Sequence, residues 1–445
     1  MKGLIFVIPI LKRLEKTDPV KLVVAGYILY ITIGALLLLL PFSRRSEISC
    51  LDSLFISTSA VSTTGLATVE VCSNYTFFGQ LVILCLIQLG GIGYMTFSSF
   101  VILTSKRKLP ETANGIASTV FSIPRNFKIE KFIVSVVMFT FVFELLGAIS
   151  LYYIFKNANI ENPLWQAIFH SISAFCTAGF SLFATGMEQF KTDFWLNAVI
   201  SVLSIAGAMG FIVCVDIWRK LRGKKRKITF TSKIIITTTF WLLFIGTFLV
   251  LVTENFDAGC TPAQKLQISF FQVMTSITTV GFNTVTIAGL GKSTIFLLAM
   301  LMIIGASPSG TGGGLKTTTF TSIYGLVKSV MFGREEVKFW NVAIPEARIR
   351  VAVASMGLYL ATFAIGTYLL ALTENSRFIE IIFEAASALG TVGLSLGITS
   401  SLSVLGKVVI ILLMYIGRVG PLTFGIALFV KPKLIFDDEQ TDLAV

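Results

Sequence analysis

The chain has 445 residues, of which 54% are hydrophobic and only 13% charged, and its mean hydropathy is +0.83. A soluble domain cannot keep so apolar a surface in water, so the composition indicates an integral membrane protein and leaves no room for a soluble catalytic domain. The formal charge of +12 could suggest nucleic-acid binding. Most Lys and Arg, however, lie in loops beside apolar segments, as is typical of the cytoplasmic face of a membrane. We therefore expect a lipid bilayer as the partner, with neither nucleic-acid binding nor enzymatic activity.

One unit recurs along the chain: a span-length helix, a shorter amphipathic helix, a polar loop and a returning span. In chain order these segments are 21–41, 51–62 and 77–104; 131–155, 163–176 and 194–218; 233–252, 263–278 and a return from Ser293; 349–373, 377–390 and 403–430. The repeats are predicted to occupy 1–108, 109–224, 225–330 and 331–445. The expected fold is an all-α integral membrane protein with eight transmembrane helices and four re-entrant pore helices around a pseudo-fourfold pore.

Each short helix is followed by a Thr-x-Gly loop. The four copies are Thr63-Thr64-Gly65, Thr177-Ala178-Gly179, Thr279-Val280-Gly281 and Thr391-Val392-Gly393. Backbone that leaves helical geometry inside a bilayer must line a wet cavity or be shielded by protein. Four such loops around one axis would direct carbonyl oxygens at a central cation. We predict that these twelve residues form a selectivity filter; the alternative, ordinary turns between packed helices, rarely repeats one tripeptide frame four times.

A second motif supports the same repeat frame. Gly90-Gly91-Ile92-Gly93 in the first returning span resembles Gly417-Arg418-Val419-Gly420 in the fourth, and Gly207-Ala208-Met209-Gly210 fits between them. The third returning span has a glycine-rich tract instead, formed by Gly305, Ala306, Ser307, Pro308, Ser309, Gly310, Thr311, Gly312, Gly313 and Gly314. Glycine and proline disfavour helix interiors. We interpret the tract as a flexible flap across the inner pore, that is, a gate; a plain break between two half-helices is the alternative.

Two ionisable residues, Lys316 and Arg418, complete the predicted site. Lys316 either faces the cavity or extends to the cytoplasmic edge. Arg418 lies in mid-span, where an unpaired charge is costly, so we expect it to face the pore axis and form a barrier to cations. The alternative for Arg418 is a structural ion pair with an acidic partner, for which the candidates are Asp216, Glu380 and Glu384. His170 is expected to pack or hydrogen-bond, because no catalytic constellation accompanies it.

Each repeat contains two complete crossings, so all inter-repeat loops and both termini should lie on one side. That side contains most of the basic residues, including the run 219–227, and is therefore predicted to be cytoplasmic. The expected location is the plasma membrane, crossed several times.

Four span–pore-loop–span repeats, one glycine in each filter loop, the tract in the third return and the arginine in the fourth together resemble the Trk/Ktr/HKT superfamily of potassium transporters. The resemblance covers nearly the whole chain. In that superfamily a glycine in all four loops goes with potassium, and a serine in the first goes with sodium. It therefore implies potassium as the ion at the filter residues, a gating-loop role for the tract, and a pore-arginine role for Arg418.

The first span begins near Lys21, which leaves no space for the additional pair of spans of the TrkH branch. The resemblance therefore favours the membrane subunits of Ktr systems. It implies a homodimer on a KtrA-like cytosolic ring of nucleotide-binding regulators, with ATP or ADP on that partner and no cofactor in this chain. The basic loops 104–131 and 219–233 are either contact surfaces for the ring or merely solvated.

The predicted function is potassium uptake through a passive or sodium-coupled pore. The filter loops lack the second glycine and the tyrosine of the TVGYG loops of tetrameric potassium channels, so we expect looser discrimination. The alternatives are a sodium or mixed-cation transporter of the same superfamily and a secondary transporter with inverted repeats. Even numbers of crossings make the repeats parallel, which disfavours the latter.

Overall fold

The computed structural model describes residues 19–93, 129–223, 227–256 and 259–429, and these are almost entirely helical. The long helices that open each repeat are α2 (Pro19–Leu39), α8 (Ile129–Asn157), α12 (Phe230–Thr253) and α16 (Glu346–Thr373). The short helices before the Thr-x-Gly loops are α3 (Cys50–Val61), α9 (Pro163–Phe175), α13 (Pro262–Thr278) and α17 (Phe378–Gly390). The predicted bounds of these eight segments are confirmed to within one helical turn.

The returning segments comprise α5 (Phe77–Ile92), α10 (Phe194–Met209), α11 (Phe211–Leu221), α14 (Lys292–Ile303), α15 (Thr317–Met331), α18 (Val404–Val419) and α19 (Pro421–Phe429). Smaller elements are α4 (Val71–Asn74), the 3-10 turns η1 (Pro41–Ser43), η2 (Glu188–Phe190), η3 (Ile287–Gly289) and η4 (Thr399–Ser401), and an antiparallel hairpin of β1 (Lys338–Phe339) and β2 (Val342–Ala343). Within the described residues this hairpin is the only sheet.

Two of the short helices, α3 and α13, begin at N-termini that are capped by a side chain. The Ser49 hydroxyl accepts the Asp52 N–H at 3.0 Å, and Thr261 forms a reciprocal capping box with Gln264. A side-chain oxygen at this position satisfies an N–H that has no partner within the helix, so each cap fixes where its helix starts. At the other end, α13 and α17 finish at the left-handed residues Thr279 and Thr391, which belong to the loops.

Two returning spans were predicted to be continuous, over 194–218 and 403–430, and this was wrong. The first bends by 99° between α10 and α11, and the second bends by 92° between α18 and α19. Both breaks fall on a glycine with positive φ, Gly210 at 85° and Gly420 at 89°. A residue in that region cannot continue a right-handed helix, and glycine adopts the region without steric cost. The first returning span was predicted to reach residue 104, but α5 ends at Ile92 and the remainder lies outside the described residues.

Four described helices are long and apolar enough to cross a membrane, and two bent pairs also qualify if each pair is counted as one span. The four are α2, α8, α12 and α16, and they carry large exposed apolar side chains such as Leu29, Leu145, Phe244 and Ile365. Exposed apolar surface on this scale is expected where lipid tails replace water. The described residues therefore form a membrane protein.

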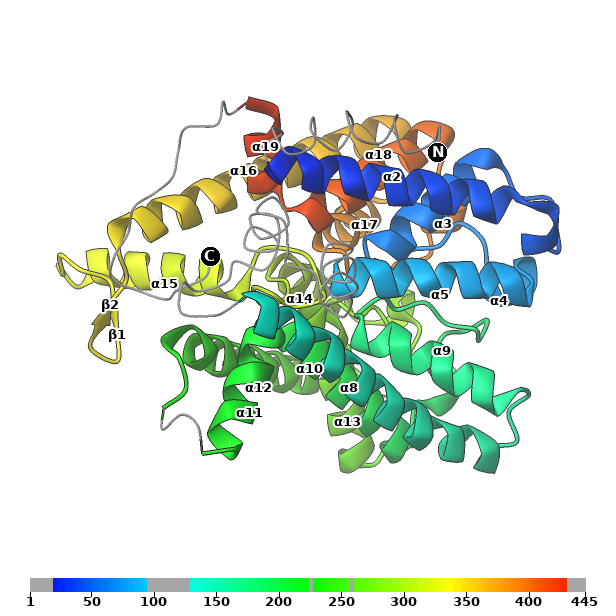
Figure 1. Cartoon of the computed structure of the whole chain (residues 1–445), viewed down its shortest axis with the longest axis horizontal. Coiled ribbons are helices and arrows are strands. Elements are labelled where there is room, and N and C mark those ends of the chain that lie inside the picture. Colours follow the sequence, from blue (N-terminus) through cyan, green and yellow to red (C-terminus); the bar gives the residue numbers. More distant parts are fainter. Residues whose placement is uncertain (1–18, 94–128, 224–226, 257–258, 430–445) are drawn as a thin grey trace, which may run out of the picture.

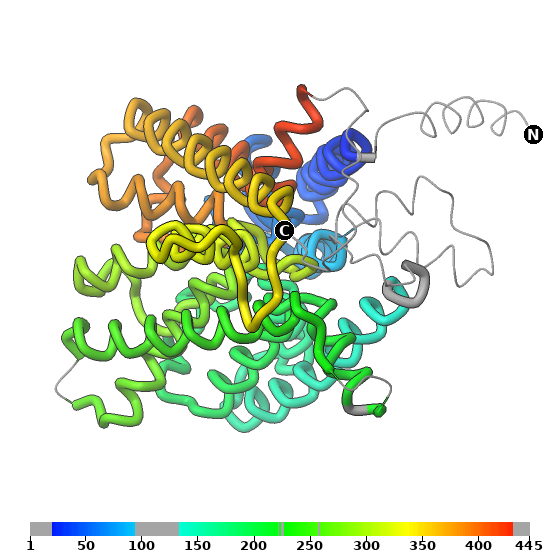
Figure 2. Tube along the Cα trace, turned by 90° about the vertical axis from the view of Figure 1, so that its left-hand side faces the viewer, coloured from blue at the N-terminus to red at the C-terminus, as the bar shows by residue number. Residues whose placement is uncertain are grey.

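Helix packing follows a cycle. Within each quarter of the chain the long helix packs on the short helix: α2 on α3, α8 on α9, α12 on α13 and α16 on α17. Between quarters, each returning helix packs on the next short helix: α5 on α9, α10 on α13, α14 on α17 and α18 on α3. Figure 2 shows the result, with the blue, teal, green and orange parts of the chain in four successive sectors. In Figure 1 the hairpin and α15 lie at the left of the molecule, and α4 lies near the opposite edge.

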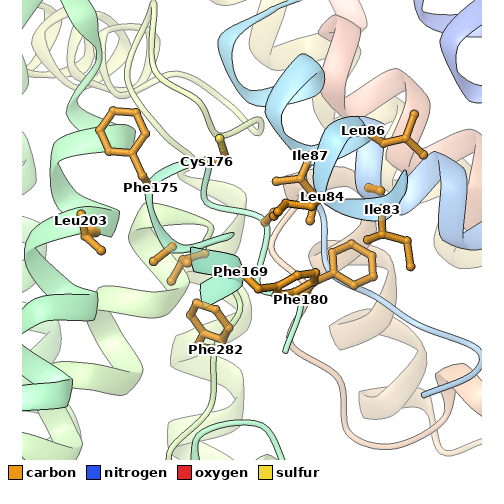
Figure 3. Packing of buried hydrophobic residues seen from close by; sticks show 14 of the residues in the cluster. Ile83, Leu84, Leu86, Ile87, Phe169, Phe175, Cys176, Phe180, Leu203 and Phe282 are labelled. Carbon is orange, nitrogen blue, oxygen red and sulfur yellow. The ribbon is translucent and has the colours of Figure 1, made fainter. Parts of the chain in front are cut away.

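The largest buried apolar cluster fills the contact between the first two quarters. Ile83, Leu84 and Ile87 of α5 face Phe169 of α9 and Phe180 of the loop that follows it (Figure 3). All five side chains are nearly inaccessible. This packing holds the ends of the short helices, and therefore the loops beyond them, in fixed positions.

Candidate functional site

The four Thr-x-Gly loops meet in a closed ring. A Cβ added to Gly65 would lie 2.4 Å from the carbonyl oxygen of Ala178, and one added to Gly179 would lie 2.2 Å from that of Val280. The same construction places Gly281 against the Val392 oxygen at 2.0 Å, and Gly393 against the Thr64 oxygen at 2.1 Å. Each loop thus touches the backbone of the next, and the fourth touches the first. The structure brings together all twelve residues that the sequence predicted as a filter.

The loops also share one backbone conformation. The threonines that open them, Thr63, Thr177, Thr279 and Thr391, have φ of 53°, 51°, 59° and 52°, and the four glycines have φ between 64° and 96°. Positive φ is uncommon for a non-glycine residue and costs about 1–3 kcal/mol, so it persists only where the surroundings impose it. Four equivalent strained threonines indicate that one geometry was retained in all four copies.

Hydroxyls on the short helices hold the loop backbone from behind. The N–H of Gly65 donates to Ser59 Oγ at 3.0 Å, and the N–H of Gly393 donates to Ser387 Oγ at 3.0 Å. In the second repeat, Ser173 Oγ donates to the Phe180 carbonyl at 2.8 Å. The sequence analysis did not identify these serines; alignment of the four repeats on their glycines would have revealed them.

The glycine-rich tract, residues 305–314, lies directly against the threonines of the four loops; we call it the gate loop and them the filter threonines, after their predicted roles. Thr63 Oγ1 donates to the Thr311 carbonyl at 3.2 Å, and Thr177 Oγ1 is 3.0 Å from Thr311 Oγ1.

The other two threonines contact the next residues of the gate loop. The N–H of Gly313 donates to Thr391 Oγ1 at 2.9 Å, and a Cβ on Gly312 would lie 2.1 Å from Thr279 Oγ1. All four filter threonines therefore contact three consecutive residues of the gate loop, which closes that side of the ring.

Arg418 fixes the gate loop at this position. Its guanidinium donates to the carbonyls of Thr311 and Gly90 and, at 3.0 Å, to Thr63 Oγ1. The arginine thus bridges the fourth returning helix, the first returning helix and the gate loop.

The carboxylates considered as ion-pair partners of Arg418 are engaged elsewhere in the described structure. Asp216 accepts from Thr229 and Ser232, Glu380 from Arg377, and Glu384 from Ser395 and Thr399. The guanidinium donates to carbonyl and hydroxyl oxygens. Within the described part of the chain no carboxylate pairs with it, and its positive charge lies beside the ring.

Lys316 follows the gate loop and donates from Nζ to the Gly312 carbonyl at 2.9 Å. It lines a cavity of about 160 Å³ together with Tyr27, Gly310, Tyr359 and Arg418. Of the two placements that the sequence left open, the structure supports the cavity-facing one. No filter residue is among the described residues that line this cavity, so the gate loop separates it from the ring.

The gate loop is docked on the break of the second returning span. The N–H of Ser307 donates to the Ala208 carbonyl at 3.0 Å, that of Thr311 to the Gly207 carbonyl at 3.1 Å, and that of Phe211 to the Ser309 carbonyl at 3.2 Å. The two glycine-rich segments that the sequence aligned as equivalents therefore bind each other. The loop is a break between the half-helices α14 and α15, and it lies against the threonines of the ring. Its role as a flexible flap that gates the pore stays a prediction.

His170 is a fully buried packing and hydrogen-bonding residue, as expected. Its ring stacks on Phe183 with 4.7 Å between centroids. The sequence analysis missed a second buried polar group: Glu144 of α8 accepts from Gln88 Nε2 at 3.0 Å and lies 3.7 Å from the Cys176 sulfur. The other charged residues of α8, Glu130, Lys131 and Lys156, lie near its ends, so the position of Glu144 in the middle of the apolar helix was the available signal.

Comparison with known proteins agrees with this architecture. Residues 12–434 match the family described as TrkH, a cation transport protein. The chain is 35% identical to the Ktr system potassium uptake protein B of Bacillus subtilis, over 93% of this chain and 94% of that protein. It is 34% identical to the potassium/sodium uptake protein NtpJ of Enterococcus hirae, over 94% and 95% of the two chains.

A solved structure shows the same fold. The crystal structure of the potassium transporter TrkH from Vibrio parahaemolyticus superposes with a TM-score of 0.74 at 21% identity, and the match covers 93% of this chain and 85% of that one. The resemblance inferred from the repeats is confirmed, and the protein is a transporter rather than an enzyme. The chain belongs to the TrkH family of cation transport proteins.

Proposed function

We propose that this protein takes up potassium across the plasma membrane through the ring formed by its four Thr-x-Gly loops. The closed cycle of glycine-to-carbonyl contacts carries the proposal, because it gathers backbone oxygens from all four repeats around one axis. Such a ring can replace the hydration shell of an alkali cation. Each short helix ends at the ring, so its negative dipole end also favours a cation there. Thr63, Thr64, Gly65, Thr177, Ala178, Gly179, Thr279, Val280, Gly281, Thr391, Val392 and Gly393 form the proposed potassium site.

In this proposal the ring is the axis of a pseudo-fourfold pore with eight spans and four re-entrant helices. The spans are α2, α8, α12 and α16, with α5, α10–α11, α14–α15 and α18–α19 as their returning partners. Both termini are cytoplasmic, because the described basic residues Arg219, Lys233, Lys328, Arg334 and Arg348 lie at the ends joined by inter-repeat connections. The repeat boundaries follow those predicted from the sequence.

Potassium is the proposed ion because two relatives are named for potassium uptake and because all four loops carry glycine. The name of NtpJ includes sodium as well as potassium. Sodium-dependent uptake, or a mixed potassium and sodium flux, is therefore the second candidate.

The gate loop, Lys316 and Arg418 form the proposed gate, in its closed position. Permeation requires Thr311, Gly312 and Gly313 to leave the filter threonines, which breaks the hydrogen bonds from Arg418 and Thr63 to Thr311. The positive charge of Arg418 beside the ring adds an electrostatic barrier to cations.

We further propose that the protein functions as a homodimer on a cytosolic, KtrA-like ring that carries ATP or ADP. Support comes from the names of the relatives, which describe one component of a Ktr system. The described part of the basic segment 219–233 is a candidate contact, and the segment 104–131 lies outside the described residues.

The test is complementation of a bacterial strain that lacks its own potassium uptake systems, grown at limiting potassium. Gly281→Ser should abolish growth, because any side chain at this positive φ meets the Val392 carbonyl. Gly289→Ser is the matched control, since a Cβ at Gly289 meets no atom within 4 Å, and it should grow as wild type. Growth of Gly281→Ser at the wild-type rate would refute the proposed pore.

A further inference from the structure

The four short helices share a phenylalanine but differ in the residue that follows it. Phe55, Phe169, Phe271 and Phe383 occupy equivalent positions before the filter, and all four are buried. The next residues are Ile56, His170, Gln272 and Glu384, and each of these side chains is 0% exposed. Three buried polar groups and one aliphatic group thus occupy one quasi-equivalent position behind the ring.

We call the residues that follow the glycine of each Thr-x-Gly loop its outer limb. In the second repeat, hydrogen bonds of the side chain at this position link the short helix to the outer limb of its own loop. The N–H of Leu182 donates to His170 Nε2 at 3.3 Å, and Ser181 Oγ lies 3.1 Å from the same nitrogen. Because a backbone N–H can only donate, Nε2 is the acceptor. His170 Nδ1 faces the Gln166 carbonyl at 2.8 Å and so carries the proton. The limb just beyond Gly179 is therefore anchored to the helix by a neutral histidine.

The third and fourth repeats make the same tie with different chemistry. Gln272 Nε2 donates to Thr284 Oγ1 at 2.9 Å. Ser395 Oγ donates to one carboxylate oxygen of Glu384 at 2.8 Å, and Thr399 Oγ1 donates to the other. Ser181 and Ser395 occupy equivalent places after their glycines, as do Leu182 and Thr284. The imidazole binds the second and third residues after its glycine, the amide binds only the third, and the carboxylate binds the second and the sixth.

The first repeat lacks this tie. Ile56 can neither donate nor accept a hydrogen bond. Thr68 occupies the place of Thr284, and its buried hydroxyl lies beside the Asp52 carboxylate. The residue after the shared phenylalanine therefore makes no side-chain hydrogen bond to the outer limb in the first repeat.

We propose that His170, Gln272 and Glu384 are positioning residues that hold the outer limbs of their filter loops, and that Ile56 leaves the first loop the most compliant of the four. The residue at this position then helps to set how strictly potassium is selected over sodium. A rigid ring of carbonyl oxygens that cannot contract favours potassium, the larger cation. A flexible outer limb lets the carbonyl oxygens move closer together and so bind sodium, the smaller one. The inference depends on the proposed function of the ring as a cation filter.

Proteoliposomes containing the purified full-length protein give the test, with potassium and sodium influx measured under matched gradients. Glu384→Leu removes both hydroxyl bonds and should lower the potassium-to-sodium flux ratio about threefold or more. Glu384→Gln can still hydrogen-bond the hydroxyls of Ser395 and Thr399 through its amide oxygen and nitrogen, so most of the wild-type potassium-to-sodium flux ratio should remain. Ile56→Gln supplies an amide at the position that Gln272 occupies in the third repeat and should raise the ratio. Ser276→Ala is the matched control, because Ser276 Oγ donates to the Gln272 carbonyl of its own helix rather than to the outer limb.

An unchanged ratio in Glu384→Leu, or an equal loss in Glu384→Gln and Glu384→Leu, would overturn the inference; the latter would assign the effect to charge. If a Glu384 variant does not fold, the other two variants test the inference. Ile56→Gln should raise the potassium-to-sodium flux ratio, and Gln272→Leu should lower it.

Amide hydrogen exchange supplies a readout that does not depend on transport. In the wild type, the limb after Gly65 should exchange faster than the limbs after Gly179, Gly281 and Gly393, and Ile56→Gln should slow it. An absence of both effects contradicts the inference. If Ile56→Gln slows exchange after Gly65 but the protein transports no cation, the result would support the hydrogen bond to the outer limb and refute the proposed function.

Discussion

The filter loops and the breaks in the returning helices show opposite uses of the same fourfold repetition. At the filter, four loops share a positive-φ threonine, a positive-φ glycine and one pattern of contact with the next loop. At the breaks, the second and fourth repeats turn sharply at one glycine, whereas the third uses the longer segment 304–316. A central ion needs equivalent ligands from every repeat, but a gate needs only one moving part. The molecule remains symmetric where the cation is proposed to bind and differs between repeats where the path is closed.

The strictest test of this equivalence is one added methyl group in each filter loop. Gly65→Ala, Gly179→Ala, Gly281→Ala and Gly393→Ala all place a Cβ within 2.4 Å of a neighbouring carbonyl oxygen. Each should lower potassium influx into liposomes by about tenfold or more, because positive φ and the clash each cost at least about 1 kcal/mol. If alanine in one of the four loops left potassium influx at the wild-type value, the four loops would not be equivalent.

The difference between the repeats at the gate is tested by removing hydrogen bonds that hold the gate loop in place. Arg418→Gln removes the charged donors to Thr311 and Gly90. Hydrogen bonds from a charged group are worth about 1.5–3 kcal/mol, so influx should rise several-fold as the closed position loses stability. Arg377→Gln, which replaces an exposed guanidinium that is paired with Glu380, is the control and should leave influx unchanged. Lower influx in Arg418→Gln would mean that the arginine supports the open pathway.

The two one-residue breaks are predicted to differ from each other. A Cβ on Gly210 would lie 2.5 Å from the Pro308 carbonyl of the gate loop, whereas one on Gly420 meets only Thr423 Oγ1, at 3.6 Å. Gly420→Ala should therefore lower stability by about 1–3 kcal/mol through backbone strain alone. Gly210→Ala should also displace the gate loop and change influx. Thermal unfolding in detergent and influx, measured on both variants, would show whether the breaks are equivalent after all.

The smallest effect is expected at the outer contact between the first and fourth repeats. Lys407 of α18 donates to Asp52 of α3 at 2.7 Å, and both side chains remain partly exposed, at 16% and 14%. Lys407→Met should lower the free energy of unfolding by about 1 kcal/mol, since partly exposed ion pairs contribute little. Addition of Asp52→Asn should restore part of that loss, because it removes the unpaired carboxylate. Full additivity in this double-mutant cycle would show that the two residues are not coupled.

The sequence predicted the symmetric part of the molecule better than the asymmetric part. The Thr-x-Gly frame and the apolar periodicity located every short helix, because both signals are local. The sharp turns at Gly210 and Gly420 were missed, since a glycine in an apolar run is also compatible with a straight span. The glycine-rich tract suggested a gate, but its docking on Gly207 and Ala208 depends on contacts between distant segments.

The position shared by Ile56, His170, Gln272 and Glu384 was hidden for another reason. Its four side chains differ in chemistry, so no residue pattern marks it, and only the common phenylalanine before it could have aligned the copies. The hydrogen bonds to the outer limbs depend on how the folded chain brings these residues together, which residue type alone does not reveal.

Anomalous diffraction from crystals grown in thallium would test the central claim most directly, because thallium substitutes for potassium and scatters strongly. We expect a peak on the axis of the ring, surrounded by the carbonyl oxygens of Thr64, Ala178, Val280 and Val392. Thallium bound only away from those four loops would contradict the assignment of the ring as the cation site.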